Sequence, residues 1–257
     1  MNTNGMLRPS PSDTSRSEID RSVEEVLGTT GRAPHWQTYF KDHRERLALD
    51  FEWITHAVDK SAEILEIGGY PYFLTRSLQR AGFAVHSADA RVGEAAHLAQ
   101  QLSLPVSWCD IENADLPFPD ATFDEVIFNE VFEHLRINPI FAVRNLMRVL
   151  RPGGRLWLST PNLKSLRGII NFLWHSEAWS VVGEGLYAQY DSFEKGDGMG
   201  HVREYTSVEV GKFLNEVGFK VEKVMYRGRS RNELMNVAFK LVPSFRPYFT
   251  IISRKAP

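Results

Sequence analysis

Residues 63–69 read EILEIGG, a short apolar run that ends in two glycines. A stretch with helical spacing follows at 72–80, and a second apolar run at 83–88 ends at Asp89. Strand, helix and strand in this order form a βαβ unit, in which the two strands run parallel. The segment from 63 to 89 therefore predicts a parallel sheet that is covered by helices.

The same alternation continues along the chain on both sides of an irregular stretch at 163–200. It predicts an α/β fold, namely a Rossmann-like, doubly wound, mostly parallel seven-stranded sheet with an antiparallel last strand and an inserted aromatic cap. The further strands are predicted at 106–109, 123–128, 155–159, 220–226 and 248–253, and the further helices at 94–102, 139–150, 207–217 and 232–241.

The chain has 257 residues, which suits one large α/β domain with additions. Residues 1–30 are rich in Ser, Pro, Thr and charge, and we expect a flexible arm with at most one short helix there. Apolar residues recur at helical spacing within 31–60, which predicts one or two helices. The main domain is expected at 61–257, with the cap inserted at 163–200.

The composition excludes several classes of protein. Charged residues make up 24% of the chain and the formal net charge is -2, which argues against a generic polyanion binder. The single cysteine, Cys109, excludes an intramolecular disulfide and a multi-cysteine zinc site. No apolar run approaches the roughly 20 residues of a membrane-spanning helix, and the polar start lacks the core of a secretory signal. We therefore expect no integral membrane span and a cytoplasmic location.

Polar residues directly follow the predicted strands, at the edge where a doubly wound sheet binds its ligands. Glu66 stands at the end of the first strand, Asp89 at the end of the second and Asp110 after the third. A dinucleotide fingerprint needs glycines at positions that hold Tyr70 and Phe73, so a phosphate cradle is disfavoured. Acids that end successive strands, with no basic residue placed among them at those ends to bind a phosphate, favour a cationic nucleoside. Asp89 can accept both hydrogen bonds of its ribose diol.

Several short motifs lie in order between Ser61 and Asn162. They are ILEIGG (64–69), the acid Asp89, CDIE (109–112), LPF (116–118) leading to FDEVI (123–127), EVFEHL (130–135) and LRPGG (150–154). Together they resemble class I S-adenosylmethionine-dependent methyltransferases. The resemblance implies S-adenosylmethionine as cofactor, with its methionine moiety bordered by Glu66, Gly68 and Gly69, its ribose by Asp89, its adenine by Asp110 and Ile111, and its methionine end by Asn129.

Simpler interpretations of the same residues stay open. Gly68 and Gly69 are also what a tight turn needs, and Asp89 and Asp110 are also what a helix N-cap prefers. The glycine-rich loop of the family has two further glycines, whereas this chain has tyrosines at positions 70 and 72. This departure leaves open a catalytically silent, methyltransferase-like subunit that binds a partner.

Two histidines are candidates for the end of the site where the methyl acceptor binds. His134 follows the fourth strand and titrates near neutral pH, so it is a candidate base or acceptor-orienting group. His201 lies where the cap meets the next helix and is a second candidate, with Arg203 and Tyr205 as contacts of the acceptor. Packing or capping roles are the alternative for both histidines.

A metal site is not expected from the motif after the fourth strand. Glu130, Glu133 and His134 do not form the His-Glu-x-x-His zinc pattern, and one histidine beside carboxylates is poor evidence of a metal. We therefore expect no required metal, while a divalent ion that assists a sugar diol stays open.

The acceptor class follows only loosely from the sequence. The aromatic residues of the cap suit stacking on a ring or sugar face and its glycines suit a hinged lid, although both would also serve a small core of the cap itself. Residues 201–219 (HVREYTSVEVGKFLNEVGF) loosely resemble the region after the core in methyltransferases of bacterial glycan and secondary-metabolite biosynthesis. We expect O-methylation of a sugar, glycan or other small-molecule hydroxyl, with a lipid or quinone-like phenol as the alternative acceptor.

Other partners are constrained to different degrees. After the fourth strand the chain reads NEVF (129–132) and lacks the Asn/Asp-Pro-Pro-Tyr/Phe pattern of amino-methylating nucleic-acid enzymes, so we expect no nucleic-acid partner. Between residues 223 and 255, eight basic residues stand against one acid, which leaves peripheral contact with a membrane open. The sequence does not indicate an oligomeric state.

Overall fold

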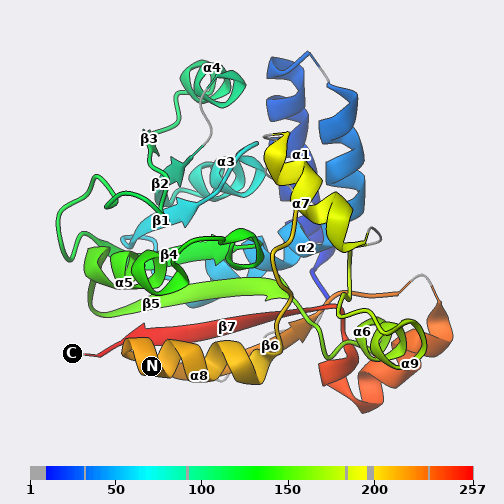
Figure 1. Ribbon diagram of the computed structural model, residues 1–257. Coiled ribbons are helices and arrows are strands. Elements are labelled where there is room, and N and C mark those ends of the chain that lie inside the picture. The colour runs from blue at the N-terminus through cyan, green and yellow to red at the C-terminus, as the bar shows by residue number, and fades with distance from the viewer. Residues whose placement is uncertain are drawn as a thin grey trace.

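A computed structural model describes residues 10–31, 33–90, 93–182, 185–195, 200–230 and 232–256. Within them, one seven-stranded sheet has the strand order β3-β2-β1-β4-β5-β7-β6 (Figure 1). The pairs from β3 to β5 are parallel, and β7 is antiparallel to both of its neighbours. The predicted fold class is confirmed. The strands are β1 Glu63–Ile67, β2 Ala84–Asp89, β3 Val106–Trp108, β4 Phe123–Asn129, β5 Leu150–Pro161, β6 Phe219–Arg227 and β7 Tyr248–Lys255.

Helices cover both faces of the sheet because its central strands are apolar on both sides. In β1, Ile64 packs into a core that includes residues of the helices before and after it, whereas the next residue, Leu65, packs into a second core on the opposite face. Successive side chains of a strand point to opposite faces, so this alternation follows directly from the sequence. The helices of the main domain are α3 Phe73–Arg80, α4 Glu94–Gln101, α5 Pro139–Val149, α8 Ser207–Val217 and α9 Glu233–Leu241.

The N-terminal part of the chain differs from the expected flexible arm. A 17-residue helix, α1, spans Asp13–Thr29, and a 24-residue helix, α2, spans Pro34–Ala57. Ile19, Val23 and Val26 of α1 are buried in the core that α2 and α3 share. Their spacing places them on one face of the helix, and this apolar stripe outweighs the polar composition of the segment. Residues 1–9 of the expected arm lie outside the described residues.

The cap contains three short helical segments, α6 Leu166–Ile170, η2 Asn171–His175 and α7 Leu186–Glu194. Most of its large aromatic side chains are exposed, and Trp174 retains 74% of its accessible surface. One of them, Phe193 of α7, lines the main cavity and lies against the guanidinium of Arg136 at 4.9 Å. Stacking on a ligand and a small core within the cap were the two alternatives for these aromatic residues. Among the described aromatic residues of α6, η2 and α7, only Phe193 reaches the cavity, and most of the others are exposed. Residues 183–184 and 196–199 of the cap lie outside the described ranges.

Gly200, at the end of the cap, is required by packing. A Cβ atom built on it would lie 2.1 Å from the carbonyl oxygen of Gln189. This close approach, and not the freedom of a hinge, explains the glycine. None of the helices in the described ranges combines the length and the apolar character that crossing a membrane requires.

Candidate functional site

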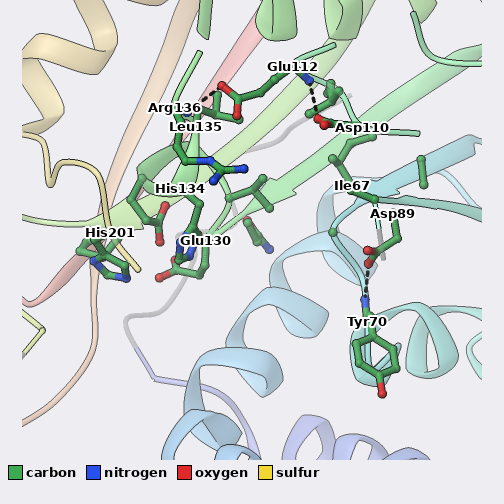
Figure 2. Close-up of a pocket in the computed structure, with 18 of the residues that line it drawn as sticks. Ile67, Tyr70, Asp89, Asp110, Glu112, Glu130, His134, Leu135, Arg136 and His201 are labelled. Carbon is green, nitrogen blue, oxygen red and sulfur yellow. Dashed lines mark hydrogen bonds between the residues drawn. The ribbon is translucent and has the colours of Figure 1, made fainter. Parts of the chain in front are cut away.

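The main cavity lies at the carboxyl ends of the parallel strands. Its volume is about 530 Å³, and its walls come from β1, β2 and β4, the loop after β3, one face of α2 and the cap (Figure 2). Seven predicted site residues line it, namely Gly68, Asp89, Asp110, Ile111, Asn129, His134 and His201. The structure therefore brings these seven to one place.

The loop after β1 depends on its two glycines. Gly68 has φ +69°, and a Cβ atom on it would lie 2.8 Å from the side chain of Val131. A Cβ atom on Gly69 would lie 2.7 Å from Oγ of Ser87. Both positions thus exclude larger residues, and the Gly68 amide donates a hydrogen bond to Ala88 at 2.8 Å. The glycines do form a tight turn, but Gly68 also lines the cavity.

Glu66 supports this loop from below instead of lining the main cavity. It borders a smaller adjoining cavity of about 40 Å³ together with both glycines. Its carboxylate accepts a hydrogen bond from the hydroxyl of Thr75. Burial raises the pKa of Glu66 to about 7.

Of the two tyrosines in the loop, Tyr72 has a backbone conformation that would suit glycine, and Tyr70 anchors the loop. Tyr72 has φ 67°, a left-handed conformation that costs a residue with a Cβ atom, and its side chain is fully buried. The amide of Tyr70 donates to Oδ2 of Asp89 at 3.1 Å (Figure 2). The loop is thereby fastened to the end of β2. The ring centroids of Trp36 and Tyr70 are 4.9 Å apart, with the rings perpendicular.

The alternative of helix capping fails for Asp89. The following helix, α4, has Gly93 as its N-cap, and Asp89 ends β2 with only 6% of its surface exposed in the cavity wall. Asp110 lines the cavity and caps no helix either, since the residues after it form a turn; its oxygens accept from the Glu112 amide at 3.1 Å and from Asn113 Nδ2 at 2.6 Å. Asp110 therefore also holds a local turn.

Glu112 fixes the rim of the cavity near the predicted adenine end. Its Oε1 accepts from the amides of Arg136 at 2.7 Å and Ile137 at 2.6 Å (Figure 2). This carboxylate ties the loop after β3 to the segment that leads into α5. Ile111, which is buried between them, supplies an apolar wall.

The side chain of Asn129 carries a hydrogen-bond acceptor that is unsatisfied in the described part of the chain. It is the last residue of β4, and its Oδ1 atom is buried without a hydrogen-bond partner in the described part of the chain. Leaving a buried acceptor unsatisfied costs about 1–3 kcal/mol. A ligand with an ammonium group would satisfy it, and the cavity at this point is open to such a ligand.

One face of α2 forms a wall that sequence analysis missed. Trp36, Tyr39, His43 and Arg46 line the cavity, and their spacing of three, four and three residues is that of one helix face. Arg46 donates to the Tyr39 hydroxyl at 2.9 Å. Burial, together with the charge of Arg46, lowers the pKa of His43 to about 4. The spacing was visible in the sequence, but nothing in it showed that this face of α2 meets the strand ends.

Glu130, directly after β4, is held by cations from distant segments. It accepts from Ser159 Oγ at 2.8 Å and from Arg227 Nη2 at 3.0 Å, and Arg46 Nη1 lies 3.9 Å away. Arg227 also pairs with the buried carboxylate of Asp50 in α2. Burial opposes ionisation of Glu130, but the charges of Arg46 and Arg227 outweigh it, so its pKa is lowered.

The two predicted histidines meet in the wall of the cavity. The ring centroids of His134 and His201 are 4.9 Å apart, nearly perpendicular, and Figure 2 shows the two side chains on neighbouring segments. Nδ1 of His134 lies 2.8 Å from the carbonyl oxygen of Gly200, and Nδ1 of His201 lies 3.3 Å from Oε1 of Glu204. Glu133 lies beside them, and burial together with the charge of Glu130 raises its pKa.

Two other predicted contacts of the acceptor lie elsewhere. Among the residues that the structure describes, Arg203 and Tyr205 are not part of the cavity wall. Arg203 pairs with Glu209 on the surface, and the Tyr205 ring packs 4.9 Å from Phe132. The prediction that these two side chains contact the acceptor has no support in this arrangement. The backbone turns between His201 and Arg203, so that neighbours in sequence face different sides.

The chain matches a known family model and several curated proteins. The model described as "Methyltransferase domain" matches residues 35–224. A probable S-adenosylmethionine-dependent methyltransferase of Mycolicibacterium smegmatis is 34% identical over 112 residues, which is 44% of this chain and 34% of that protein. A demethylmenaquinone methyltransferase of Tropheryma whipplei is 31% identical over 153 residues, with 54% of this chain and 57% of that protein covered. The chain thus spans about a third to just over half of the length of these relatives.

Solved structures show the same fold. The structure of the Burkholderia thailandensis 1,6-didemethyltoxoflavin-N1-methyltransferase has a TM-score of 0.57 at 16% identity and covers 97% of this chain and 93% of its own. A methyltransferase from Aquifex aeolicus has a TM-score of 0.51 at 19% identity, with 80% and 89% covered. At such low identity the likeness concerns the fold, while the family model spans more than half of the sequence. The chain therefore belongs to the methyltransferase domain family.

Proposed function

We propose that this protein transfers the methyl group of S-adenosylmethionine to a hydroxyl group of a small polar acceptor, with a sugar or glycan as the first choice. One observation carries the proposal. A single cavity joins the strand ends at Gly68 and Asp89 to the histidine pair His134 and His201. Methyl transfer between two bound molecules requires that the site of the methyl donor and the site of the methyl acceptor open into each other.

The residues at the strand ends fit this cofactor. Asp89 would accept hydrogen bonds from the ribose, Asp110 and Ile111 would border the adenine, and the unsatisfied Oδ1 of Asn129 would accept from the amino group of the methionine moiety. Gly68 leaves room for that moiety to approach the backbone. Bound there, S-adenosylmethionine supplies a methyl group on a positively charged sulfur, activated for attack by a nucleophile.

The histidine pair provides basic atoms for the hydroxyl group of the acceptor. A carbonyl oxygen only accepts hydrogen bonds, so Nδ1 of His134 carries its proton toward Gly200, and Nε2 is the basic nitrogen of the neutral ring. The carboxylate of Glu204 orients His201 in the same way. When the oxygen–carbon bond forms and the carbon–sulfur bond breaks, the hydroxyl proton must leave. Nε2 of His134 is the atom that we propose accepts this proton.

The walls of the cavity favour a polar ring as the acceptor. Trp36 and Tyr39 of α2 and Phe193 of the cap supply aromatic surface, while Arg46 and Arg136 supply hydrogen-bond donors. Aromatic faces with nearby donors suit a sugar, whose faces are apolar and whose edge carries hydroxyls. The second candidate acceptor is a quinone-like phenol, which the relative from Tropheryma whipplei favours by its name, demethylmenaquinone methyltransferase.

The test is a transfer assay with methyl-labelled donor. The full chain is incubated with labelled S-adenosylmethionine and, separately, with sugars and glycans, phenols and quinols, and lipids, and the products are identified by mass spectrometry. We expect label on an oxygen atom of the first class. Label on a phenol selects the second candidate. No transfer to any class, while the donor still binds, would contradict the proposed activity and favour a silent, partner-binding subunit.

A further inference from the structure

Three side chains with metal-ligating atoms meet at the acceptor end of the cavity. One ligand atom each of Glu133, His134 and His201 lies within 4.8 Å of the other two. The first two belong to the turn after β4, whereas His201 follows the cap. All three line the cavity. The cluster therefore unites two segments that are more than sixty residues apart in sequence. A contact of 2.8 Å between Nδ1 of His134 and the Gly200 carbonyl oxygen joins the same two segments.

Each histidine is oriented by a partner outside the cluster. The Gly200 carbonyl accepts from Nδ1 of His134 at 2.8 Å, and Oε1 of Glu204 lies 3.3 Å from Nδ1 of His201. Glu204 is itself held by Ser180, whose hydroxyl and amide both donate to it. A carbonyl or carboxylate on one ring nitrogen is the arrangement that makes the other nitrogen, Nε2, a metal ligand.

The two segments are fastened to each other by their backbones. The amide of Val202 donates to the Glu133 carbonyl at 2.8 Å, and the amide of His201 donates to Oε1 of Gln189 at 2.9 Å. The hydroxyl of Thr160 in β5 donates to Oε2 of Glu133 at 2.9 Å. The cluster is thus already assembled by the fold, so that little ordering is left for an ion to impose.

The charge balance of the cluster favours a cation. Glu133 is only 1% exposed, and across the described ranges no arginine, lysine or histidine forms an ion pair with it. The neighbouring carboxylate, Glu130, does have such a partner in Arg227 at 3.0 Å. The charge of Arg46 acts on Glu133 only from a distance. A buried carboxylate without an ion-pair partner is costly, and a cation between Glu133 and the two rings would reduce that cost.

We propose that Glu133, His134 and His201 bind a divalent transition-metal ion such as Zn²⁺ or Fe²⁺. Two imidazole nitrogens and one carboxylate oxygen suit such ions better than Mg²⁺ or Ca²⁺, which prefer sites made of oxygen alone. Three protein ligands at the wall of a cavity leave coordination positions open toward it, as in catalytic and not structural sites. The expectation that no metal is required rested on a single histidine, His134, next to Glu133 in the sequence. The structure adds a second histidine, His201, which follows the cap in the sequence.

The role of the ion rests on the proposed function. A divalent ion held by these three residues would lower the pKa of a hydroxyl group that approaches it, and so would supply the means for that hydroxyl to lose its proton near neutral pH. The oxygen then forms the bond to the methyl carbon, and the sulfur keeps the electron pair of the bond that breaks. With an ion bound, Nε2 of His134 would be a ligand of the ion and not a base, and the ion would promote proton loss in its place.

The test measures metal binding directly and does not require an acceptor. The full chain, stripped with a chelator, is titrated with Co²⁺, whose visible absorption reports on nitrogen ligands. We expect one Co²⁺ per chain and a rise in the unfolding temperature. Glu133→Gln and His201→Gln should each weaken Co²⁺ binding by at least about tenfold. His97→Gln, on the exposed surface of α4, is the matched control and should bind like the wild type. Mg²⁺ should compete poorly.

The outcomes separate this proposal from the proposed function. Thermal unfolding without metal shows that each variant folds, and a parallel titration with S-adenosylhomocysteine reports on the donor site. Folded wild-type protein that binds no Co²⁺, or binds it equally well in both cluster variants, overturns the metal site, whatever happens to the donor. Equal affinity for Mg²⁺ overturns the assignment to transition metals. Metal binding without any donor binding overturns the proposed function and leaves the metal site standing.

Discussion

The proposed donor end and the proposed acceptor end of the cavity are built in different ways. Gly68, Asp89 and Asn129 stand at the ends of neighbouring strands, where the sheet itself sets their positions. The proposed acceptor end is assembled from the turn after β4 and the end of the cap, which meet where Nδ1 of His134 lies 2.8 Å from the Gly200 carbonyl oxygen, and α2 adds a further wall. The position of the donor residues thus follows from the strand pattern. The position of the acceptor residues depends on how the N-terminal helix α2 and the cap pack onto the sheet.

The largest expected effect tests the acceptor end. His134→Ala removes a basic atom, or a metal ligand, beside the acceptor, and should lower kcat by about 10²- to 10⁴-fold. Affinity for S-adenosylhomocysteine should stay within about twofold because the donor residues lie at the strand ends. Steady-state kinetics with the acceptor found in the transfer assay, together with calorimetry, checks both. A variant with full activity would remove His134 from the mechanism.

The next effect tests the donor end. Asp89→Ala should weaken binding of S-adenosylhomocysteine by about 100-fold or more, because two hydrogen bonds to a charged group, each worth about 1.5–3 kcal/mol, are lost. The anchor of the Tyr70 amide is lost as well. Asp115→Ala, an exposed acid outside the cavity wall, is the control and should bind normally. If calorimetry finds the same affinity for Asp89→Ala as for the wild type, the ribose assignment is wrong.

A third effect concerns the support under the donor end. Burial raises the pKa of Glu66 to about 7, so the folded state holds its proton more tightly than the unfolded state. The free energy of unfolding should therefore fall as pH rises from about 4.5 to about 7, by up to about 3 kcal/mol. Glu66→Gln should remove this part of the pH dependence. Urea unfolding of both proteins between pH 5 and pH 8 measures it, and parallel curves would refute the assignment.

The smallest expected effect on catalysis comes from Arg203, which lies outside the described cavity wall. Arg203 points to Glu209 on the surface and not into the cavity. Arg203→Ala should therefore change kcat and KM by no more than about twofold, in contrast to His201→Ala, which should alter at least one of them clearly. A large rise in KM for Arg203→Ala would show that the acceptor extends beyond the described cavity.

Much of the fold and the donor end could be predicted from the sequence. The alternation of EILEIGG, a helix and a strand ending at Asp89 placed the first two strands within one residue of their observed ends, apart from the glycines, because local pattern decides such elements. Gly68, Asp89 and Asn129 could be named as candidates because ligands of doubly wound sheets lie at strand ends. Their positions relative to one another needed no tertiary information beyond the order of the strands.

The acceptor end could be predicted only in part. The sequence pointed to His134 and His201 separately, but their approach to 4.9 Å depends on the path of the whole cap. Arg46 looked like one more charged position on a helix, since nothing local shows that its neighbours Tyr39 and Glu130 would bury it. Tyr205 looked like a ligand contact and turned out to be a packing residue, because the chain turns after His201.

The central claim is that the strand ends hold a cationic nucleoside and not a phosphate-bearing one. Isothermal titration of the purified full chain with S-adenosylmethionine, S-adenosylhomocysteine and ATP tests it most directly. The account predicts saturable binding of one molecule of either sulfur compound per chain and no measurable binding of ATP. Folded protein that binds neither sulfur compound, or that prefers ATP, would contradict it.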